Sequence, residues 1–437
     1  MSRLRILVLA PDANPESISV NLVCYRHAEA LARLHDVTLV GRSCHEKALR
    51  RTPASFQTIE AIAMPWLDRI FAWSVRWIFK NNFHSRALTV FGYPFSIAFE
   101  WRAWRRLRPR IVAGEFDVVL RLSPIISVIP SAFPFFLRDY CIPFIIGPIN
   151  GGLPWPKGFS QADNQKTWID KLRNLYRFLP FARSTYRGAA AIIAGSSQTY
   201  AEFAAYCEKL FFIPENGLTL SLCSNTPRRC EGNSKLELIF VGNLVPYKAC
   251  DLALRAAAPF LRSGLAHFTV AGDGPERNRL EQLTKSLEIE KAVSFCGMLP
   301  HAEAMQRLRS ADVLVFPSVR EFGGGVVFEA LALGAVPLVV DFGGPGDIVH
   351  PGVGFKVSLT NESDVVRQME GILAELIDNR DLLERLRQQG RRYARERLTW
   401  DAKAQDVTKI LQWVLRRGPR PELLPPKTLA VGVGSTI

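Results

Sequence analysis

The stretch PSVREFGGGVVFEALALG occupies residues 317–334 and follows directly on the apolar run 313–316. A buried strand that leads through three glycines into a helical pattern is typical of a parallel α/β sheet. Glycine lets a backbone approach a ligand closely, and the free N–H groups at a helix start attract phosphate. Glu321 and Glu329 flank the glycines, and their acceptor oxygens suit the hydroxyl groups of a ligand. Together these features predict a pocket for a sugar attached to a nucleoside diphosphate.

The totals of the chain limit its class. Its 437 residues exceed one ordinary core and predict two domains. The net charge of +14 indicates an anionic partner, such as a phosphorylated ligand or an acidic membrane surface, although plain solubility is the alternative. The eight cysteines form no C-x-x-C pair and have no zinc-ligand spacing with a histidine. We therefore expect no metal site and a reducing, cytoplasmic location.

No segment reads as a membrane anchor or leader. The most apolar window, residues 123–137, contains three prolines and is shorter than the roughly 20 residues that a spanning helix needs. The apolar run near the N-terminus is too short for a signal peptide and is interrupted by Pro11 and Asp12. We expect it to be the first strand of a sheet.

Apolar runs alternate with amphipathic patterns along the chain, which predicts α/β architecture with two doubly wound, Rossmann-like parallel sheets. The predicted strands are residues 4–9, 37–40, 118–120, 143–146, 191–194, 236–241, 267–271, 292–295, 313–316 and 336–340. Helices are predicted from about residues 249, 276, 301 and 325. Residues 214–234 combine prolines, charges and little periodicity, which indicates a connector between the domains. Residues 418–437 carry four prolines and read as a loose tail.

Four motifs in the second half resemble one family when they are taken in order. They are VGNLVPYK at 241–248, AGDGP at 271–275, the two glutamates at 321 and 329, and DFGGPGD at 341–347. The set resembles the retaining, metal-independent glycosyltransferases of family 4, also called glycosyltransferase group 1. The resemblance covers residues 190–400 well and the first half loosely. It implies the GT-B fold, in which two Rossmann-like domains face a central cleft.

The resemblance also implies a division of labour between the domains. Residues 1–214, rejoined by a helix at about 400–417, would form the acceptor side, and residues 215–399 would bind the nucleotide sugar. Glu321 would contact the hydroxyls of the donor sugar, Glu329 the nucleotide ribose, and Lys248 the diphosphate. The implied catalytic residues are Glu321, Lys248 and Asn150, and the implied donor-binding residues are Glu329, Gly323, Gly324, Gly325, Val326, Gly242, Asn243, Gly272 and Asp273.

Elementary chemistry agrees with these roles. A departing nucleoside diphosphate gains negative charge in the transition state, and preorganised cations and N–H dipoles stabilise that charge. The chain has no Asp-x-Asp motif, so the metal-chelating strategy of the other main glycosyltransferase fold has no visible ligands. We expect no cofactor beyond the donor substrate.

Each motif by itself has an ordinary structural explanation. A glycine-rich turn before a helix is commonly a cap, and Asp273 between glycines is commonly a turn residue. Lys248 alone would be read as a solvated charge, Glu329 as a solvent-facing helix residue, and His301 after a proline as a cap or surface residue. The joint order of the motifs favours the functional interpretation.

Three positions depart from the family pattern. Asn243 stands where the family usually has an arginine, and Ala249 follows Lys248 in place of the usual glycine. The family often has a histidine at the end of a first-domain strand, where this chain reads IIGPINGG at 145–152. We expect Asn150 to occupy that space. Arg320 and an arginine of the first domain are the candidates to supply the charge that Asn243 lacks.

Residues 66–110 predict the partner on the acceptor side. They contain five tryptophans and nine lysines or arginines against two acids. Tryptophan and arginine together favour a membrane interface, whereas a buried aromatic cluster with solvated arginines is an equally supported alternative. No nucleic-acid motif accompanies the pattern, so no nucleic-acid partner is expected. Family members often glycosylate lipid-linked acceptors, which favours peripheral contact with the inner face of the cytoplasmic membrane.

The sequence thus predicts transfer of a sugar from a nucleoside-diphosphate sugar to a lipid-linked or saccharide acceptor, with anomeric retention, in polysaccharide or glycolipid biosynthesis. The alternative is a nucleotide-sugar-binding subunit that has little or no activity and acts as a membrane-associated scaffold. A glycosidase fits less well, because it needs two carboxyls across the scissile bond. Here one glutamate lies in a loop and the other in a helix.

Overall fold

The computed structural model describes residues 2–17, 20–52, 54–65, 69–70, 73, 86–122, 129–151, 153, 179–223 and 235–423. The chain divides into two compact units, each with its own sheet. Unit 1 comprises Met1–Gly152, Lys166–Glu215 and Lys403–Ile437, and unit 2 comprises Leu153–Gln165 and Asn216–Ala402. Each unit is described by itself.

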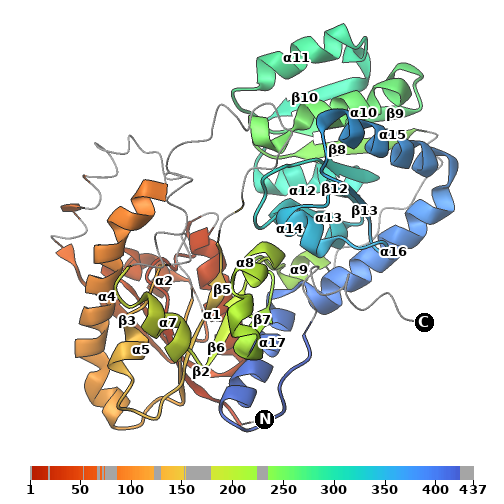
Figure 1. Ribbon diagram of the computed structural model, residues 1–437. Helices are drawn as coiled ribbons and strands as arrows, with labels where there is room; N and C mark the ends of the chain where they lie inside the picture. Colours follow the sequence, from red (N-terminus) through yellow and green to blue (C-terminus); the bar gives the residue numbers. More distant parts are fainter. Residues whose placement is uncertain are drawn as a thin grey trace. The chain divides into compact units, whose positions relative to one another are not determined.

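Unit 2 contains a six-stranded, fully parallel sheet (Figure 1). Its strands are β8 (Leu236–Val241), β9 (Ala266–Ala271), β10 (Val293–Gly297), β11 (Val313–Phe316), β12 (Val336–Val340) and β13 (Phe355–Val357). Their spatial order is β10-β9-β8-β11-β12-β13, which is the doubly wound Rossmann order. The order reverses between β8 and β11, so the connections leave these two neighbours in opposite directions. A crevice therefore opens beyond their carboxyl ends, where such sheets bind ligands.

Helices cover both faces of this sheet, because right-handed crossovers place successive helices on one face until the strand order reverses. Helices α10 (Cys250–Arg262) and α11 (Arg277–Ser286) pack together, and so do α12 (His301–Ser310), α13 (Gly325–Leu333) and α14 (Gly343–Ile348) (Figure 1). Helix α15 (Glu362–Asp378) packs on α10, and α16 (Arg380–Arg397) packs on α13. The short elements are α9 (Leu220–Cys223), η5 (Pro246–Lys248) and η6 (Glu290–Ala292).

Unit 1 repeats this plan with seven parallel strands in the order β3-β2-β1-β4-β5-β6-β7. The strands are β1 (Arg5–Leu9), β2 (Asp36–Arg42), β3 (Thr58–Ile62), β4 (Val118–Arg121), β5 (Phe144–Ile149), β6 (Ala191–Ala194) and β7 (Leu210–Phe212). The helices are α1 (Val20–Leu34), η1 (Ser43–His45), α2 (Glu46–Arg51), α4 (Arg86–Val112), α5 (Phe133–Phe136), α7 (Ala182–Gly188), α8 (Ser197–Glu202), η4 (Ala204–Lys209) and α17 (Trp400–Val414). Helix α17 passes from unit 2 to unit 1 at Lys403.

A buried ion pair anchors the core of unit 1. Glu100 on α4 and Arg121 at the end of β4 are both almost fully buried, with 2.9 Å between Oε1 and Nε. The other carboxylate oxygen, Oε2, accepts hydrogen bonds from the Ser131 hydroxyl at 3.0 Å and the Ala132 amide at 2.6 Å. Arg121 also donates to the Ile129 carbonyl at 2.7 Å. These contacts tie the chain before α5 to α4 and β4, and among the described residues Oε1 has Arg121 as an ion-pair partner but no hydrogen bond.

The prediction of two doubly wound parallel sheets is confirmed. Three strands are not predicted from the sequence, namely β3, β7 and β13, and all three lie at sheet edges. An edge strand has a neighbour on one side only, so it can be short or half-exposed and carries a weak apolar signal. The central strands have the long apolar runs because both of their faces are covered.

Candidate functional site

The two loops that leave β8 and β11 lie at the point where the strand order of unit 2 reverses. The loop after β8 carries Gly242, Asn243 and Lys248, and the loop after β11 carries Glu321 and the three glycines. The backbones are tied together, because the Tyr247 carbonyl accepts from the Val319 amide at 2.9 Å and from the Ser318 hydroxyl at 3.3 Å. The switch crevice is therefore flanked by two mutually braced loops.

Lys248 and Glu321 meet across these loops. The Lys248 ammonium donates to Glu321 Oε2, and the two side chains are only 15% and 20% exposed. The ammonium also lies 4.7 Å from the centroid of the Phe316 ring, which adds a cation–π contact. The other oxygen, Glu321 Oε1, accepts from the Gly324 amide at 3.3 Å. The predicted cation, carboxylate and glycine N–H thus form one half-buried polar cluster.

The glycine loop after β11 rests on the glycine-rich start of α14. Gly344 donates its amide hydrogen to the Glu321 carbonyl at 3.0 Å. A Cβ at Gly344 would lie 2.1 Å from the Phe322 carbonyl oxygen, so a side chain there would push the loop away. Gly324 has φ +58°, a left-handed conformation that favours glycine, and it caps α13. The motif at 341–347 therefore supports the loop that carries Glu321.

Gly242 and Gly272 end two neighbouring strands. A Cβ at Gly272 would lie 1.9 Å from the Gly242 carbonyl oxygen, and Gly272 has φ +156°. The loops after these two strands are joined by a hydrogen bond from the Leu244 amide to the Asp273 carbonyl at 2.9 Å. Close packing of the ends of β8 and β9 is thus sufficient to require glycine at position 272. A contact with a donor at these glycines stays a prediction.

Asp273 and Asn243 have local roles that the structure defines. Asp273 Oδ1 accepts from the Gly274 amide at 2.7 Å, and Oδ2 lies 3.3 Å from Nη1 of Arg277. These contacts are those of a turn residue. Asn243 has an exposed side chain, and its carbonyl accepts from the Val245 amide at 3.0 Å. Donor binding by both residues stays a prediction.

Glu329 lies in α13, after Gly325 and Val326 begin the helix. Its Oε1 is 2.9 Å from Nε2 of His301, the first residue of α12. The hydrogen bond to this carboxylate raises the pKa of His301. The sequence predicts only a cap or surface role for His301 and gives no sign of this pairing. No periodicity signal relates positions 28 residues apart on two helices.

Arg320 lies beside the cluster in the same loop as Glu321. Its Nε donates to the Leu153 carbonyl at 3.4 Å. Tyr247 is half-buried in the facing loop, and burial together with the nearby Glu321 carboxylate raises its pKa. The idea that Arg320 replaces the missing family arginine stays a prediction.

In unit 1, Asn150 directly follows β5 at the carboxyl edge of the sheet. Its amide donates to Glu215 Oε2 at 3.5 Å, and the next residue, Gly151, donates its N–H to the Thr199 hydroxyl at 2.9 Å. Packing against the neighbouring strand explains why glycine occupies position 147. A Cβ there would lie 2.3 Å from the Ile193 carbonyl oxygen, so the neighbouring strand excludes it.

Two buried basic groups hold the chain close to Asn150. His27 Nε2 donates to the Glu215 carbonyl at 2.9 Å, and the Lys403 ammonium donates to the Pro214 carbonyl at 2.6 Å. Burial lowers the pKa of His27 to about 4 and that of Lys403 to about 7. Because no aqueous shell solvates them, both groups favour their neutral forms more than they would in water.

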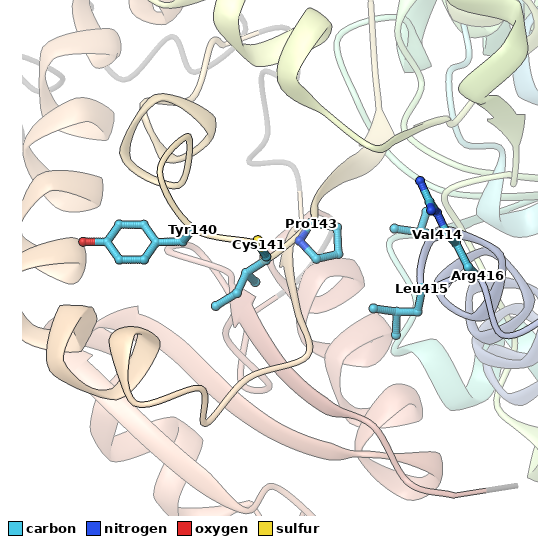
Figure 2. Close-up of a pocket in the computed structure, with 7 residues that line it drawn as sticks. Tyr140, Cys141, Pro143, Val414, Leu415 and Arg416 are labelled. Carbon is cyan, nitrogen blue, oxygen red and sulfur yellow. The ribbon is translucent and has the colours of Figure 1, made fainter.

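Unit 1 also contains two hollows. The smaller, of about 420 Å³, lies between the chain that enters β5 and the end of α17. Figure 2 shows Cys141 and Pro143 on one side of it and Val414, Leu415 and Arg416 on the other, with Tyr140 pointing away. It adjoins the amino ends of the strands. Ligands of doubly wound sheets bind at the carboxyl ends, so this hollow carries no assignment.

The larger hollow has a volume of about 870 Å³ and is rich in aromatic side chains. It is lined by Phe135, Leu179, Phe181, Ala182, Arg183, Ser184, Tyr186, Arg187, Glu202, Phe203, Ala205 and Tyr206. Arg183 and Arg187 are one helical turn apart on α7, and neither forms an ion pair with any residue that the structure describes. Aromatic walls with a few polar groups and unpaired cations suit an anionic ligand that has an apolar or sugar face.

The tryptophan- and arginine-rich segment is only partly described, since Trp66, Trp77, Arg76 and Lys80 lie outside the described residues. Trp73 and Trp101 are exposed, whereas Trp104 stacks on Phe136 with centroids 5.5 Å apart. Both alternatives from the sequence thus apply to part of the segment. Two of its positive charges are neutralised by an acid outside the segment, because Arg106 and Arg110 both pair with Glu60 on β3. Membrane contact stays a prediction.

None of the described helices combines the length and apolar composition needed to cross a membrane. Within the same residues, no three His, Cys, Asp or Glu side chains gather into a group that could hold a metal ion.

Part of the sequence, including these loops, is similar to known glycosyltransferases. Residues 230–393 match the family model described as "Glycosyl transferases group 1". The chain is 33% identical over 208 residues to the D-inositol 3-phosphate glycosyltransferase of Thermobispora bispora, a match covering 45% of this chain and 46% of that one. It is 32% identical over 201 residues to the glycogen synthase of Mycobacterium tuberculosis, with the same two shares. The matched part therefore spans less than half the length of these relatives.

Solved structures resemble nearly the whole chain. The Anabaena protein HepE in complex with UDP has a TM-score of 0.61 at 16% identity, covering 94% of this chain and 100% of that one. Sucrose-phosphate synthase from Thermosynechococcus elongatus has a TM-score of 0.59 at 16% identity, covering 95% and 100%. These likenesses establish the fold, which is GT-B. Residues 230–393 of this GT-B chain thus resemble the glycosyl transferases group 1 family.

Proposed function

We propose that this protein is a metal-independent, retaining glycosyltransferase of the family 4 type, which uses a nucleoside-diphosphate sugar as its donor. The observation that carries the proposal is the Lys248–Glu321 pair at the switch crevice of unit 2, with the Gly324 N–H on the same carboxylate. A cation and a glycine loop at a helix start suit a diphosphate, and a carboxylate suits sugar hydroxyls. The UDP bound to HepE makes uridine donors the first to test.

The charges of this cluster serve the chemistry of sugar transfer. In the ligand-free protein Glu321 neutralises Lys248, so the cation is preorganised close to where a diphosphate would leave. As the C1–O bond to the diphosphate breaks, negative charge grows on the leaving oxygen and the ammonium stabilises it. The acceptor oxygen bonds to C1 on the same face, and its proton passes to the departing diphosphate. This sequence retains the anomeric configuration without a protein nucleophile.

The acceptor is the less defined half of the proposal. We assign it to unit 1 as a lipid-linked or saccharide acceptor, in polysaccharide or glycolipid biosynthesis. The 870 Å³ hollow supports this assignment through its rings and its Arg183–Arg187 pair. Exposed Trp73, Trp101 and Phe135 support peripheral contact with the inner face of the cytoplasmic membrane.

A second candidate is a nucleotide-sugar-binding subunit that lacks strong activity. Asn243 and Asn150 favour it, because each stands where the family usually places a charged or titratable side chain. This candidate would bind the same donor and act as a membrane-associated scaffold.

The decisive experiment separates binding from turnover. Thermal unfolding is measured with a panel of uridine, guanosine and adenosine diphosphate sugars; a donor at a hundred times its dissociation constant should stabilise the fold by about 2.7 kcal/mol. Release of the nucleoside diphosphate is then followed with the donor that binds. Replacing Glu321 with alanine should abolish release, whereas Glu303→Ala, an exposed change on α12, should not.

The outcomes divide the candidates clearly. Turnover with a product of the same anomeric configuration, read by NMR, supports a retaining transferase. Binding without release or transfer to any acceptor favours the scaffold. If none of the donors shifts the unfolding transition, the nucleotide-sugar assignment is wrong.

A further inference from the structure

His301 pairs with Glu329, and the proposed function gives His301 no role. Glu329 is 24% exposed, and its Oε1 is held at 2.9 Å by Nε2 of His301. Among the residues that the structure describes, no hydrogen bond to Oε2 is formed. One carboxylate oxygen is thus fixed by the protein and the other is available to a ligand.

The backbone places the imidazole with little freedom. Pro300 precedes His301 with φ −55°, and His301 begins α12, which packs against α13. The proline fixes its own φ and disfavours helical geometry at the residue before it, so the helix starts abruptly at His301. Since α12 and α13 are packed elements, the ring approaches Glu329 from a fixed direction.

Orientation of Glu329 matters for the ligand that the site would hold. A carboxylate binds two neighbouring hydroxyls well only when its plane is aligned with them, and a free glutamate side chain loses rotamer entropy on binding. A hydrogen bond that holds one oxygen beforehand removes part of that loss. A ribose offers two such neighbouring hydroxyls at C2 and C3.

We propose that His301 is a positioning residue that holds Glu329 in the orientation that accepts the ribose diol of the nucleotide. This inference rests on the proposed function, in which the donor is a nucleoside-diphosphate sugar. The competing explanation is a solvated ion pair: the His301 side chain is 73% exposed, and exposed pairs contribute about 0–1 kcal/mol to folding. Removal of a structural pair of that kind would not change nucleotide affinity in a way that depends on the ribose hydroxyls.

The test is therefore a thermodynamic cycle that combines removal of the His301 side chain with removal of the ribose hydroxyls from the nucleotide. The affinities of wild type and His301→Ala are measured by titration calorimetry for uridine diphosphate and for its 2′,3′-dideoxy analogue, with adenosine and guanosine diphosphates in parallel. We expect His301→Ala to weaken binding of the ribonucleotide by roughly 5- to 10-fold, because the variant must order the Glu329 side chain when the ribose binds. Binding of the dideoxy nucleotide should not change. His301→Gln, which can still donate, should restore most of the affinity.

Unit 2 offers a matched control. His267 on β9 pairs with Glu237 through Nδ1 and Oε2 at 3.3 Å, and both side chains are about one-third exposed. His267→Ala removes a comparable histidine–glutamate pair and should change neither affinity. Because His301 is largely exposed, its alanine variant should also keep the unfolding temperature of wild type.

The possible results distinguish failure of the positioning role of His301 from failure of the proposed function. An equal loss for both nucleotides, or no loss for either, overturns the positioning role while wild-type binding upholds the proposed function. If wild type binds none of the three nucleoside diphosphates, the proposed function fails and the role of His301 fails with it.

Discussion

The Lys248–Glu321 pair makes a prediction that needs no ligand. Both side chains are at least four-fifths buried, so neither charge is fully solvated when its partner is removed. Two charges 4 Å apart interact by about 4 kcal/mol at the effective dielectric of a protein surface, and desolvation offsets part of this. We therefore expect Lys248→Met to lower the free energy of unfolding by about 2–3 kcal/mol, because it leaves a mostly buried carboxylate without its cation. Glu321→Gln should lower it by about 1–2 kcal/mol, since an amide still accepts from the ammonium.

The double variant distinguishes an interaction from two independent effects. Lys248→Met with Glu321→Gln should be less destabilised than the sum of the single changes by at least about 1 kcal/mol, because no charge is left unpaired. Urea denaturation of the ligand-free protein, followed by the transition of unit 2, measures the cycle. The exposed pair Arg392–Glu396, 2.9 Å apart on α16, is the control, and its coupling should be below about 0.5 kcal/mol. Additivity at Lys248 and Glu321 within about 0.5 kcal/mol would refute the reasoning.

Three further changes test the backbone and a buried base. Ala249 has φ +52°, a left-handed conformation that glycine adopts without strain. Ala249→Gly should therefore raise the free energy of unfolding in urea by about 0.5–1 kcal/mol. Gly272→Ala should lower it by at least about 3 kcal/mol, because the new Cβ would meet the Gly242 carbonyl oxygen at 1.9 Å. His27 has a folded pKa of about 4 against an ordinary 6.5, so the unfolded chain binds more protons between these values and stability falls as pH falls through that window, by up to about 3 kcal/mol. His27→Gln should flatten that slope in a series of urea melts.

Each of these changes has a result that would contradict it. A lower stability of Ala249→Gly would mean that the alanine methyl packs better than its conformation is strained. Gly264 has φ +74° with open space around it, so Gly264→Ala shows the conformational penalty alone and should be much milder than Gly272→Ala. If both glycine variants lose the same stability, the clash at Gly272 is not the cause. An unchanged pH profile in His27→Gln would assign the acid sensitivity to other groups.

The central strands and the loop motifs could be predicted because their signals are local. The runs at β11 and β12 are apolar throughout, and the run at β8 is interrupted only by Glu237. A strand that is covered on both faces needs little else to be recognised. Glu321 and the glycines after it follow such a strand within a few residues. Their position at a carboxyl end of the sheet therefore follows from the strand assignment.

The partners of those residues could not be predicted in the same way. Lys248 and Glu321 are 73 residues apart, and His301 and Glu329 are 28 apart on two helices. The pairing of Arg106 and Arg110 with Glu60 changed the apparent charge of a segment that looks almost purely cationic when it is read alone. The need for glycine at position 147 comes from Ile193 of the neighbouring strand, which is 46 residues away in the chain.

Composition, apolar runs and the order of the glycine motifs were enough to predict a doubly wound α/β protein with a segment that resembles the glycosyl transferases group 1 family. Short-range periodicity and turn chemistry reside in neighbouring residues, so they can be read from the sequence. Strand order decided the rest. The reversal between β8 and β11 brings the Lys248 loop against the Glu321 loop, and a crossover of that kind is a property of the folded sheet that no local stretch of chain encodes.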